Sequence, residues 1–151
     1  MVDTLSVGER SRVMSLVRGK NTRPEMLVRR LLHGAGFRYR LHDATLPGKP
    51  DLVFSRKRKV IFVHGCFWHR HQDCDLARIP KSNQAFWLAK LEGNKIRDES
   101  NQRKLQDAGW STLVVWECEL RDLEALERRL RQFLAVSAVP PRDRPTHLRP
   151  G

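Results

Sequence analysis

The segment that decides the fold is PDLVFSRKRKVIFVHGCFWHRH, residues 50–71. It contains two short apolar runs, Leu52–Phe54 and Val60–Val63, separated by the charged stretch Ser55–Lys59. Two continuously apolar runs joined by a polar turn are typical of a β-hairpin in a sheet that is covered on both faces. The sequence therefore predicts a buried hairpin at the centre of the protein.

Helical and strand patterns on both sides of this hairpin complete the architecture. A third apolar run, residues 112–116, has the same character as the first two, and apolar residues recur at helical spacing in residues 22–34, 82–108 and 122–136. The expected order is helix, strand, strand, helix, strand, helix. This order indicates an α/β fold with a mixed β-sheet flanked by helices.

The length and composition predict one folded domain. The chain has 151 residues, of which 40% are hydrophobic, and this is enough for one core without disulfide support. We expect a basic N-terminal arm with a short helix at residues 1–20, the main domain at 21–136, and a Pro-rich disordered tail at 137–151. No apolar run is long enough to span a membrane and no leader pattern is visible, so a cytoplasmic protein is expected.

The charge balance points to a polyanionic partner. Lys and Arg number 29 against 17 Asp and Glu, which gives a net charge of +12. Such a basic chain favours nucleic acid over an acidic protein or a neutral surface. The alternative is a basic soluble protein with no such partner.

Asp51 and His64 are the first candidates for chemistry. If the hairpin turn comprises residues 56–59, Asp51 lies directly opposite His64, and opposed side chains share a face of the sheet. The backbone carbonyl of Val63 can then point towards a cation held by Asp51, and Mg²⁺ prefers such oxygen ligands. The alternative is that Asp51 only caps the turn that follows residues 47–50.

A dense group of metal-ligand residues follows the second strand. Residues 64–74 hold five Cys or His side chains, and another Cys lies just after the third expected strand. A closed zinc site takes four nitrogen or sulfur ligands. The alternative is three buried free cysteines. The candidate ligands are Cys66, Cys74, Cys118 and either His69 or His71.

A zinc site of this kind uses one histidine and leaves two beside Asp51 for proton transfer. Asp98 shares a helical stripe with apolar residues, so we consider that it points inward and pairs with one of these histidines. The simpler interpretation of the helix pattern alone is a half-exposed carboxylate on a polar helix.

Three aromatic residues have two interpretations. Phe67 and Trp68 lie inside the expected metal-anchored loop, and Trp87 lies in the following helix. In a basic protein such residues usually belong to the core. A rigid loop instead favours a wedge that inserts between base pairs.

These motifs resemble those of the very-short-patch repair (Vsr) endonucleases. The similarity runs from about Arg10 to Arg121, and its most specific stretch is Val60–His69. Pro50-Asp51 resembles the start of a PD-(D/E)xK nuclease motif, with Phe62 and His64 where its second carboxylate and lysine usually stand. The resemblance implies a restriction-endonuclease-like core with a structural zinc site.

The resemblance also implies roles for the site residues. Asp51 and the Val63 carbonyl would hold Mg²⁺, while His64 and Glu25 would act through metal-bound water. A second explanation exists for Glu25, because it completes a helix-capping box with Thr22.

His69, oriented by Asp98, would be the general base. The family pattern assigns zinc to His71 and the three cysteines, although two residues separate His71 from Cys74 here, where members usually have one. The residues implied in DNA intercalation are Phe67, Trp68 and Trp87, with Met14 and Val17 of the arm.

The implied reaction is Mg²⁺-assisted hydrolysis of double-stranded DNA on the 5′ side of the thymine in a T·G mismatch. This reaction begins repair of deaminated 5-methylcytosine. The resemblance implies a monomer with functional links to a DNA cytosine methyltransferase and mismatch-repair proteins. Two alternatives are a nuclease of the same fold with another DNA target and a DNA-binding module that does not cleave.

Overall fold

A four-stranded mixed sheet carries the functional residues. The computed structural model describes residues 21–136, and its strands lie in the order β1-β2-β3-β4. The pairs β1–β2 and β2–β3 are antiparallel, whereas β3 and β4 run parallel. This confirms the predicted mixed sheet. The strands are β1 (Arg40–Leu41), β2 (Leu52–Phe54), β3 (Lys59–His64) and β4 (Ser111–Trp116).

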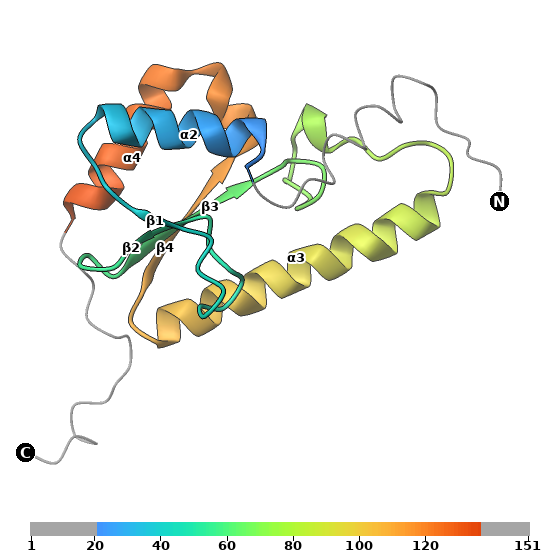
Figure 1. The fold of residues 1–151 in the computed structure, drawn as a ribbon. Coiled ribbons are helices and arrows are strands. Elements are labelled where there is room, and N and C mark those ends of the chain that lie inside the picture. Colours follow the sequence, from blue (N-terminus) through green and yellow to red (C-terminus); the bar gives the residue numbers. More distant parts are fainter. Residues whose placement is uncertain (1–20, 137–151) are drawn as a thin grey trace, which may run out of the picture.

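Helices cover both faces of the sheet. Figure 1 shows α2 and α4 on one face and the long α3 on the other. The helices are α2 (Arg23–Gly34), α3 (Gln84–Asp107) and α4 (Leu123–Ala135), and two 3₁₀ turns, η1 (Asp75–Ala77) and η2 (Glu117–Arg121), complete the described chain. The three predicted helices and the hairpin are therefore confirmed.

Two apolar cores follow from the alternation of side chains along the strands. Leu52, Ile61 and Val115 pack with α2 and α4, whereas Val53 and Val60 pack in a second cluster that includes Leu105 of α3. In α4 the buried residues Leu126, Leu130 and Leu134 lie at helical spacing and face the first core. The sheet is thus held rigidly between its helices.

The hairpin turn lies one residue earlier than predicted. Residues 55–58 form the turn, so Phe54 pairs with Lys59 and Leu52 with Ile61. The predicted turn at 56–59 was wrong because Lys59 is a buried strand residue: its side chain is 2% exposed, and its ammonium group donates to backbone carbonyls at the end of α4. A charged residue in a basic run therefore stabilises a helix terminus.

This shift changes the partner of Asp51. In the observed register, residue 51 lies opposite Phe62 and not opposite His64. The predicted direct pairing of Asp51 with His64 is therefore wrong. His64 lies two residues beyond Phe62 on β3. Because side chains alternate between the two faces of a strand, His64 still lies on the same face as the residue opposite Asp51.

Strand β1 was not predicted from the sequence. It contains only Arg40 and Leu41, and both are exposed, so it lacks the apolar pattern of a buried strand. Met14, Val17, the expected arm and the Pro-rich tail lie outside the described residues. No helix within residues 21–136 is long and apolar enough to cross a membrane.

Candidate active site

A cleft of about 1130 Å³ opens beside the ends of β2 and β3. Its walls include four acidic residues from separate segments: Glu25 of α2, Asp51 just before β2, Asp98 of α3 and Glu117 of η2. The cleft walls also contain basic residues. A cleft lined by both acidic and basic groups suits a phosphate substrate that is bound together with a cation. The basic residues of the cleft walls are Arg23, Lys90, Arg97 and Arg121.

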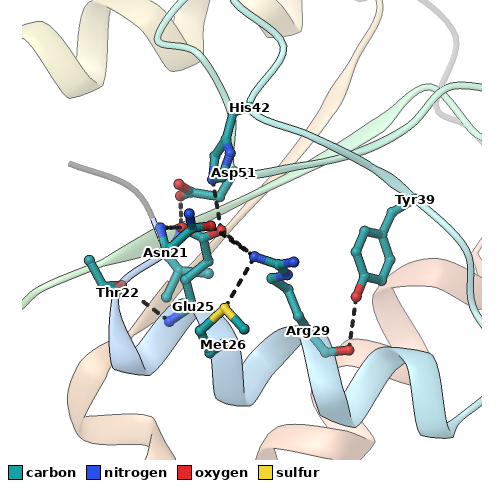
Figure 2. A network of polar contacts seen from close by, with 9 residues as sticks. Asn21, Thr22, Glu25, Met26, Arg29, Tyr39, His42 and Asp51 are labelled. Carbon is teal, nitrogen blue, oxygen red and sulfur yellow. Dashed lines mark hydrogen bonds and ion pairs between the residues drawn. The ribbon is translucent and has the colours of Figure 1, made fainter. Parts of the chain in front are cut away.

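Glu25 is placed by the start of α2. Thr22 caps this helix by accepting the Glu25 N–H at 3.3 Å. The Glu25 carboxylate accepts the Asn21 N–H at 3.0 Å, and it lies 3.5 Å from Arg29 and 2.7 Å from His42 (Figure 2). Glu25 is 1% exposed. It therefore belongs to a buried polar network, and helix capping alone does not explain its position.

Asp51 lies beside Glu25 where β2 begins (Figure 2). Burial, with a smaller contribution from the neighbouring Glu25 carboxylate, raises the pKa of Asp51 to about 7, although the Val63 N–H opposes this shift. That N–H donates to Asp51 Oδ2 at 2.7 Å. A buried pair of carboxylates is favoured in its charged form by a divalent cation, so the donor set fits one.

His42 completes this acidic group and was missed in the sequence. Ligand atoms of Glu25, His42 and Asp51 lie within 4.8 Å of one another. The His42 N–H donates to the Asp51 carbonyl at 3.1 Å, which extends the β1–β2 pairing by one residue. The only available signal was a partly polar segment before the Pro50-Asp51 motif, and this signal was too weak to predict a strand.

A second group contains the two histidines expected to transfer protons. The rings of His64 and His69 are stacked, with centroids 3.7 Å apart and planes 6° from parallel. His69 Nδ1 lies 2.5 Å from Asp98 Oδ2. The predicted pairing of Asp98 with a site histidine is thus confirmed, and the Asp98 side chain is partly exposed, at 22%.

The two histidines have different environments. His64 is 5% exposed, and burial, with a smaller contribution from His69, lowers the pKa of His64 well below its usual value. His64 is therefore neutral at physiological pH. The His69 side chain is 28% exposed and lines the cleft. Since Asp98 engages Nδ1, the Nε2 atom of His69 is left for a substrate or water.

The Cys/His cluster forms as expected. Its four ligand atoms all lie within 4.8 Å of one another, and His71 Nδ1 lies 3.4 Å from Cys118 Sγ. Three sulfurs and one imidazole fit the tetrahedral preference of Zn²⁺. The structure brings together Cys66, His71, Cys74 and Cys118.

The structure also separates the two candidate histidines, because His69 belongs to the His64 and Asp98 group. Left-handed backbone at Arg70 (φ 53°) and Asp73 (φ 56°) lets the loop turn sharply on either side of His71. Cys74 therefore reaches the cluster despite the longer spacing. Burial raises the pKa of the Cys66 thiol, an effect that a bound cation would reverse.

The three aromatic residues pack against one another at the rim of the site. Phe67 is buried, with Trp68 at 5.2 Å and Trp87 at 5.5 Å between ring centroids. Trp68 and Trp87 are partly exposed. The indole N–H of Trp68 is buried and has no hydrogen-bond partner within the described residues.

Trp116 of β4 lies between the two histidine groups. Its ring stacks on His71 at a centroid distance of 4.1 Å and meets the edge of His64 at 5.3 Å. The Cys/His cluster is therefore in contact with the catalytic candidates through one indole ring. Taken together, an α/β fold, a carboxylate pair, an oriented histidine and a four-ligand cluster define a candidate metal-dependent hydrolase.

Comparisons with known proteins identify the family. The family model described as DNA mismatch endonuclease Vsr matches residues 2–76. The chain is 52% identical to Type II nicking enzyme V.XorIIP of Xanthomonas oryzae over 137 residues, which cover 91% of this chain and 100% of that protein. It is 41% identical to DNA mismatch endonuclease Vsr of Escherichia coli over 139 residues, covering 89% and 88% of the two chains.

The chain therefore belongs to the Vsr family of DNA mismatch endonucleases. Its activity is that of a DNA-nicking hydrolase in very-short-patch mismatch repair. Membership in a nuclease family implies a divalent metal ion, and the Cys/His cluster is a possible metal site.

Proposed function

We propose that this protein nicks double-stranded DNA on the 5′ side of the thymine in a T·G mismatch and that it requires Mg²⁺. The observation that carries the proposal is the convergence of Glu25, Asp51 and the Asp98-bound His69 in one cleft. Family membership supports the mismatch as the substrate class. The resemblance to restriction-endonuclease-like (PD-(D/E)xK) cores supports the same assignment, because Asp51 directly precedes a hairpin strand.

Asp51 and the backbone carbonyl of Val63 would hold the Mg²⁺ ion. The contact seen at Val63 is made by its N–H, and the N–H and C=O of one strand residue point to the same side. Glu25 supplies a second carboxylate close to Asp51. When bound, Mg²⁺ would stabilise the charge that develops on the scissile phosphate.

His69 acts as the general base in this proposal. Asp98 holds its Nδ1, so that Nε2 can accept a proton from the attacking water. His64 stacks on His69 and fixes the ring plane. His64 and Glu25 position the attacking water and also belong to the catalytic group.

Zinc bound by Cys66, His71, Cys74 and Cys118 would have a structural role. It would tie the loop that carries Phe67, Trp68 and His69 to the end of β4. A closed site with four protein ligands has no open position for substrate. The cluster would therefore hold the catalytic loop in place.

DNA binding would use the aromatic residues Phe67, Trp68 and Trp87 and the basic residues of the cleft walls. Trp68 lines the cleft, Trp68 and Trp87 are partly exposed, and the buried Phe67 packs against both rings, so Phe67 can enter a duplex only if the two indoles separate. Insertion of such rings between base pairs bends DNA. In this proposal residues 21–136 are the endonuclease domain, residues 137–151 are a disordered tail, and the arm at 1–20 inserts Met14 and Val17 from the minor groove.

The proposed biological role is repair of deaminated 5-methylcytosine in the cytoplasm. Such a role requires no second copy of the chain, so we propose a monomer. It implies functional links to a DNA cytosine methyltransferase and to mismatch-repair proteins. The names of relatives such as Type II nicking enzyme V.XorIIP are consistent with DNA nicking but do not specify the bases that flank the mismatch.

Incubation of the zinc-loaded protein with end-labelled duplexes tests the proposal. The duplexes contain T·G in varied flanking sequences, with T·A and C·G at the same position as matched controls. We expect Mg²⁺-dependent nicks 5′ of the mismatched thymine and none in the controls. Equal nicking of matched duplexes would indicate a different DNA target, and mismatch binding without nicks would indicate a binding module. Affinity should fall with salt by a log–log slope of about 0.9 per neutralised phosphate.

A further inference from the structure

His42 contacts both segments that carry the carboxylate pair. Its side-chain Nε2 lies 2.7 Å from Glu25 Oε2, and its backbone N–H donates to the Asp51 carbonyl at 3.1 Å. Figure 2 shows its ring above Glu25 and beside Asp51. We propose that His42 is a positioning residue that holds the Glu25 carboxylate next to Asp51 and so preserves the cation site; this inference rests on the proposed function.

The carboxylate pair requires such support. Glu25 and Asp51 are close and desolvated, and like charges in that position repel each other. The side chain of Glu25 is 2% exposed, so water cannot satisfy its oxygens. A carboxylate in this environment keeps a fixed position only when hydrogen-bond donors hold its oxygens.

His42 is the donor best placed to hold the Glu25 side chain. Arg29 is the other side-chain donor, but it lies further away, at 3.5 Å, and its Nη1 atom also donates to Asn21 and Met26. The Asn21 N–H engages the other oxygen, Oε1. Within residues 21–136, the hydrogen bond of the His42 side chain is to Glu25.

The backbone around His42 is arranged for this contact. His42 has a left-handed backbone (φ 48°), a conformation that is uncommon for residues other than glycine and that often marks functional sites. The segment is anchored on both sides: the Tyr39 hydroxyl donates to the Arg29 carbonyl on α2 at 3.0 Å, and Asp43 accepts the Thr45 N–H at 2.9 Å. The turn therefore directs the imidazole at α2.

Three substitutions separate the hydrogen bond from the backbone and packing. His42→Leu removes the donor with little change in volume. His42→Gln supplies an amide nitrogen with a reach similar to that of Nε2, whereas His42→Asn tolerates the left-handed backbone but is too short to reach Glu25. His33→Leu, at an exposed position near the end of α2, is the matched control.

The first measurement is Mn²⁺ binding to zinc-loaded, DNA-free protein, followed by electron paramagnetic resonance. Loss of a partner that orients a metal ligand weakens metal affinity about 10–100-fold. We expect a weakening of at least about tenfold for His42→Leu and His42→Asn. His42→Gln should bind within about threefold of wild type, as should His33→Leu. The Mg²⁺ concentration for half-maximal nicking should shift in the same order, while mismatch binding without Mg²⁺ stays constant.

Several results would overturn the role of His42. Mn²⁺ affinity equal to wild type in His42→Leu would do so, and so would equal weakening in the Leu and Gln variants, since the donor would then be irrelevant. If thermal unfolding shows that His42→Leu does not fold, the Mn²⁺ affinities of His42→Gln and His42→Asn are compared instead. Equal Mn²⁺ affinities of these two variants would contradict the proposal. Absence of nicking by wild-type protein would instead refute the proposed function, because the Mn²⁺ titration tests His42 independently of cleavage.

Discussion

The Cys/His cluster lies beside a second group, the carboxylate–histidine group of Glu25, Asp51, Asp98, His64 and His69. The two groups are built in opposite ways. In the first, three of the four ligands come from residues 66–74 and the fourth follows β4 directly. In the second, Glu25, Asp51 and Asp98 come from three distant segments. The first is closed by its own ligands, whereas the second faces a cleft. The difference indicates that one group fixes the loop and the other carries out the reaction.

Trp116 shows how the Cys/His cluster can support the carboxylate–histidine group. It stacks on His71 on one side and meets His64 on the other, and His64 in turn stacks on His69. Movement of His71 at the cluster would therefore reach His64 and His69 through the ring of Trp116, in addition to the direct chain connection to His69. We expect the two groups to fail differently when they are mutated.

The largest effect is expected for Cys118→Ser. This substitution removes the ligand that joins the loop to β4, and a structural zinc site can contribute on the order of 10 kcal/mol. We expect loss of zinc by elemental analysis and a large loss of unfolding free energy in chemical denaturation. Wild-type protein stripped with a chelator is the control and should match the variant. Unchanged zinc content would refute the ligand assignment.

The next largest effect is expected for His69→Ala. Loss of a general base lowers rates by about 10²–10⁴-fold, so single-turnover nicking should fall by that factor while mismatch affinity and zinc content remain constant. Asp98→Asn should give a smaller loss of about 10–100-fold, because it perturbs only the orientation of His69. Asp107→Asn, at an exposed position on the same helix, should be silent. A zinc loss in His69→Ala would contradict the separation of the two groups.

Asp51→Asn should show an unusual dependence of stability on pH in zinc-loaded, Mg²⁺-free protein. The pKa of Asp51 is raised from 3.8 to about 7 in the folded state, so the folded state binds this proton more tightly than the unfolded state. The contribution of protonated Asp51 to the free energy of unfolding is fully present below about pH 4 and is lost as pH rises through about 7. The Asp51→Asn variant has no ionisable carboxyl group at this position, so its stability does not show this loss. It should match wild type below about pH 4 and exceed it by up to about 4 kcal/mol at about pH 8.

Urea unfolding at several pH values measures this difference. Asp107→Asn is again the control, and its difference from wild type should not change over the same range. Titration of His64 affects wild type and variant alike and cancels in the comparison. A difference that is flat with pH for Asp51→Asn would mean that Asp51 is not a buried charge.

The smallest effect is expected for Trp116→Leu. Ring contacts of this kind contribute about 0.5–1.5 kcal/mol each, which corresponds to about a two- to tenfold change. We expect zinc to dissociate faster, as followed with a chromogenic chelator, and nicking to slow by a similar factor. An effect on only one of the two would show that Trp116 does not connect the groups.

The sequence was sufficient where ligands are local or patterns are strong. The hairpin, the three helices and the Cys/His cluster rest on apolar periodicity and short spacing, and they are confirmed. Spacing alone did not choose between His69 and His71, because both lie in the same loop; the family resemblance pointed to His71, and the structure places His71 in the cluster. The pairing of Asp98 with His69 joins residues 29 apart in sequence, and the helix pattern alone did not require it.

The errors have one physical origin, which is that polar residues were treated as solvent-exposed. Lys59 was counted in the turn because it ends a basic run, yet its aliphatic stem is buried and its ammonium group meets carbonyls of α4. That choice displaced the register by two and paired Asp51 with the wrong residue. His42 was overlooked for a similar reason, because a two-residue exposed strand has no apolar signal.

The most direct test of the account is single-turnover nicking of a T·G duplex by zinc-loaded protein as Mg²⁺ is added. Wild type should bind the duplex without Mg²⁺, nick it only after Mg²⁺ is added, and retain its zinc throughout. Asp51→Asn should bind equally well and remain inactive at every Mg²⁺ concentration. Two results would contradict the claim that the carboxylate–histidine group performs the reaction. One is nicking by Asp51→Asn, and the other is nicking by zinc-loaded wild type to which no Mg²⁺ or other divalent cation has been added.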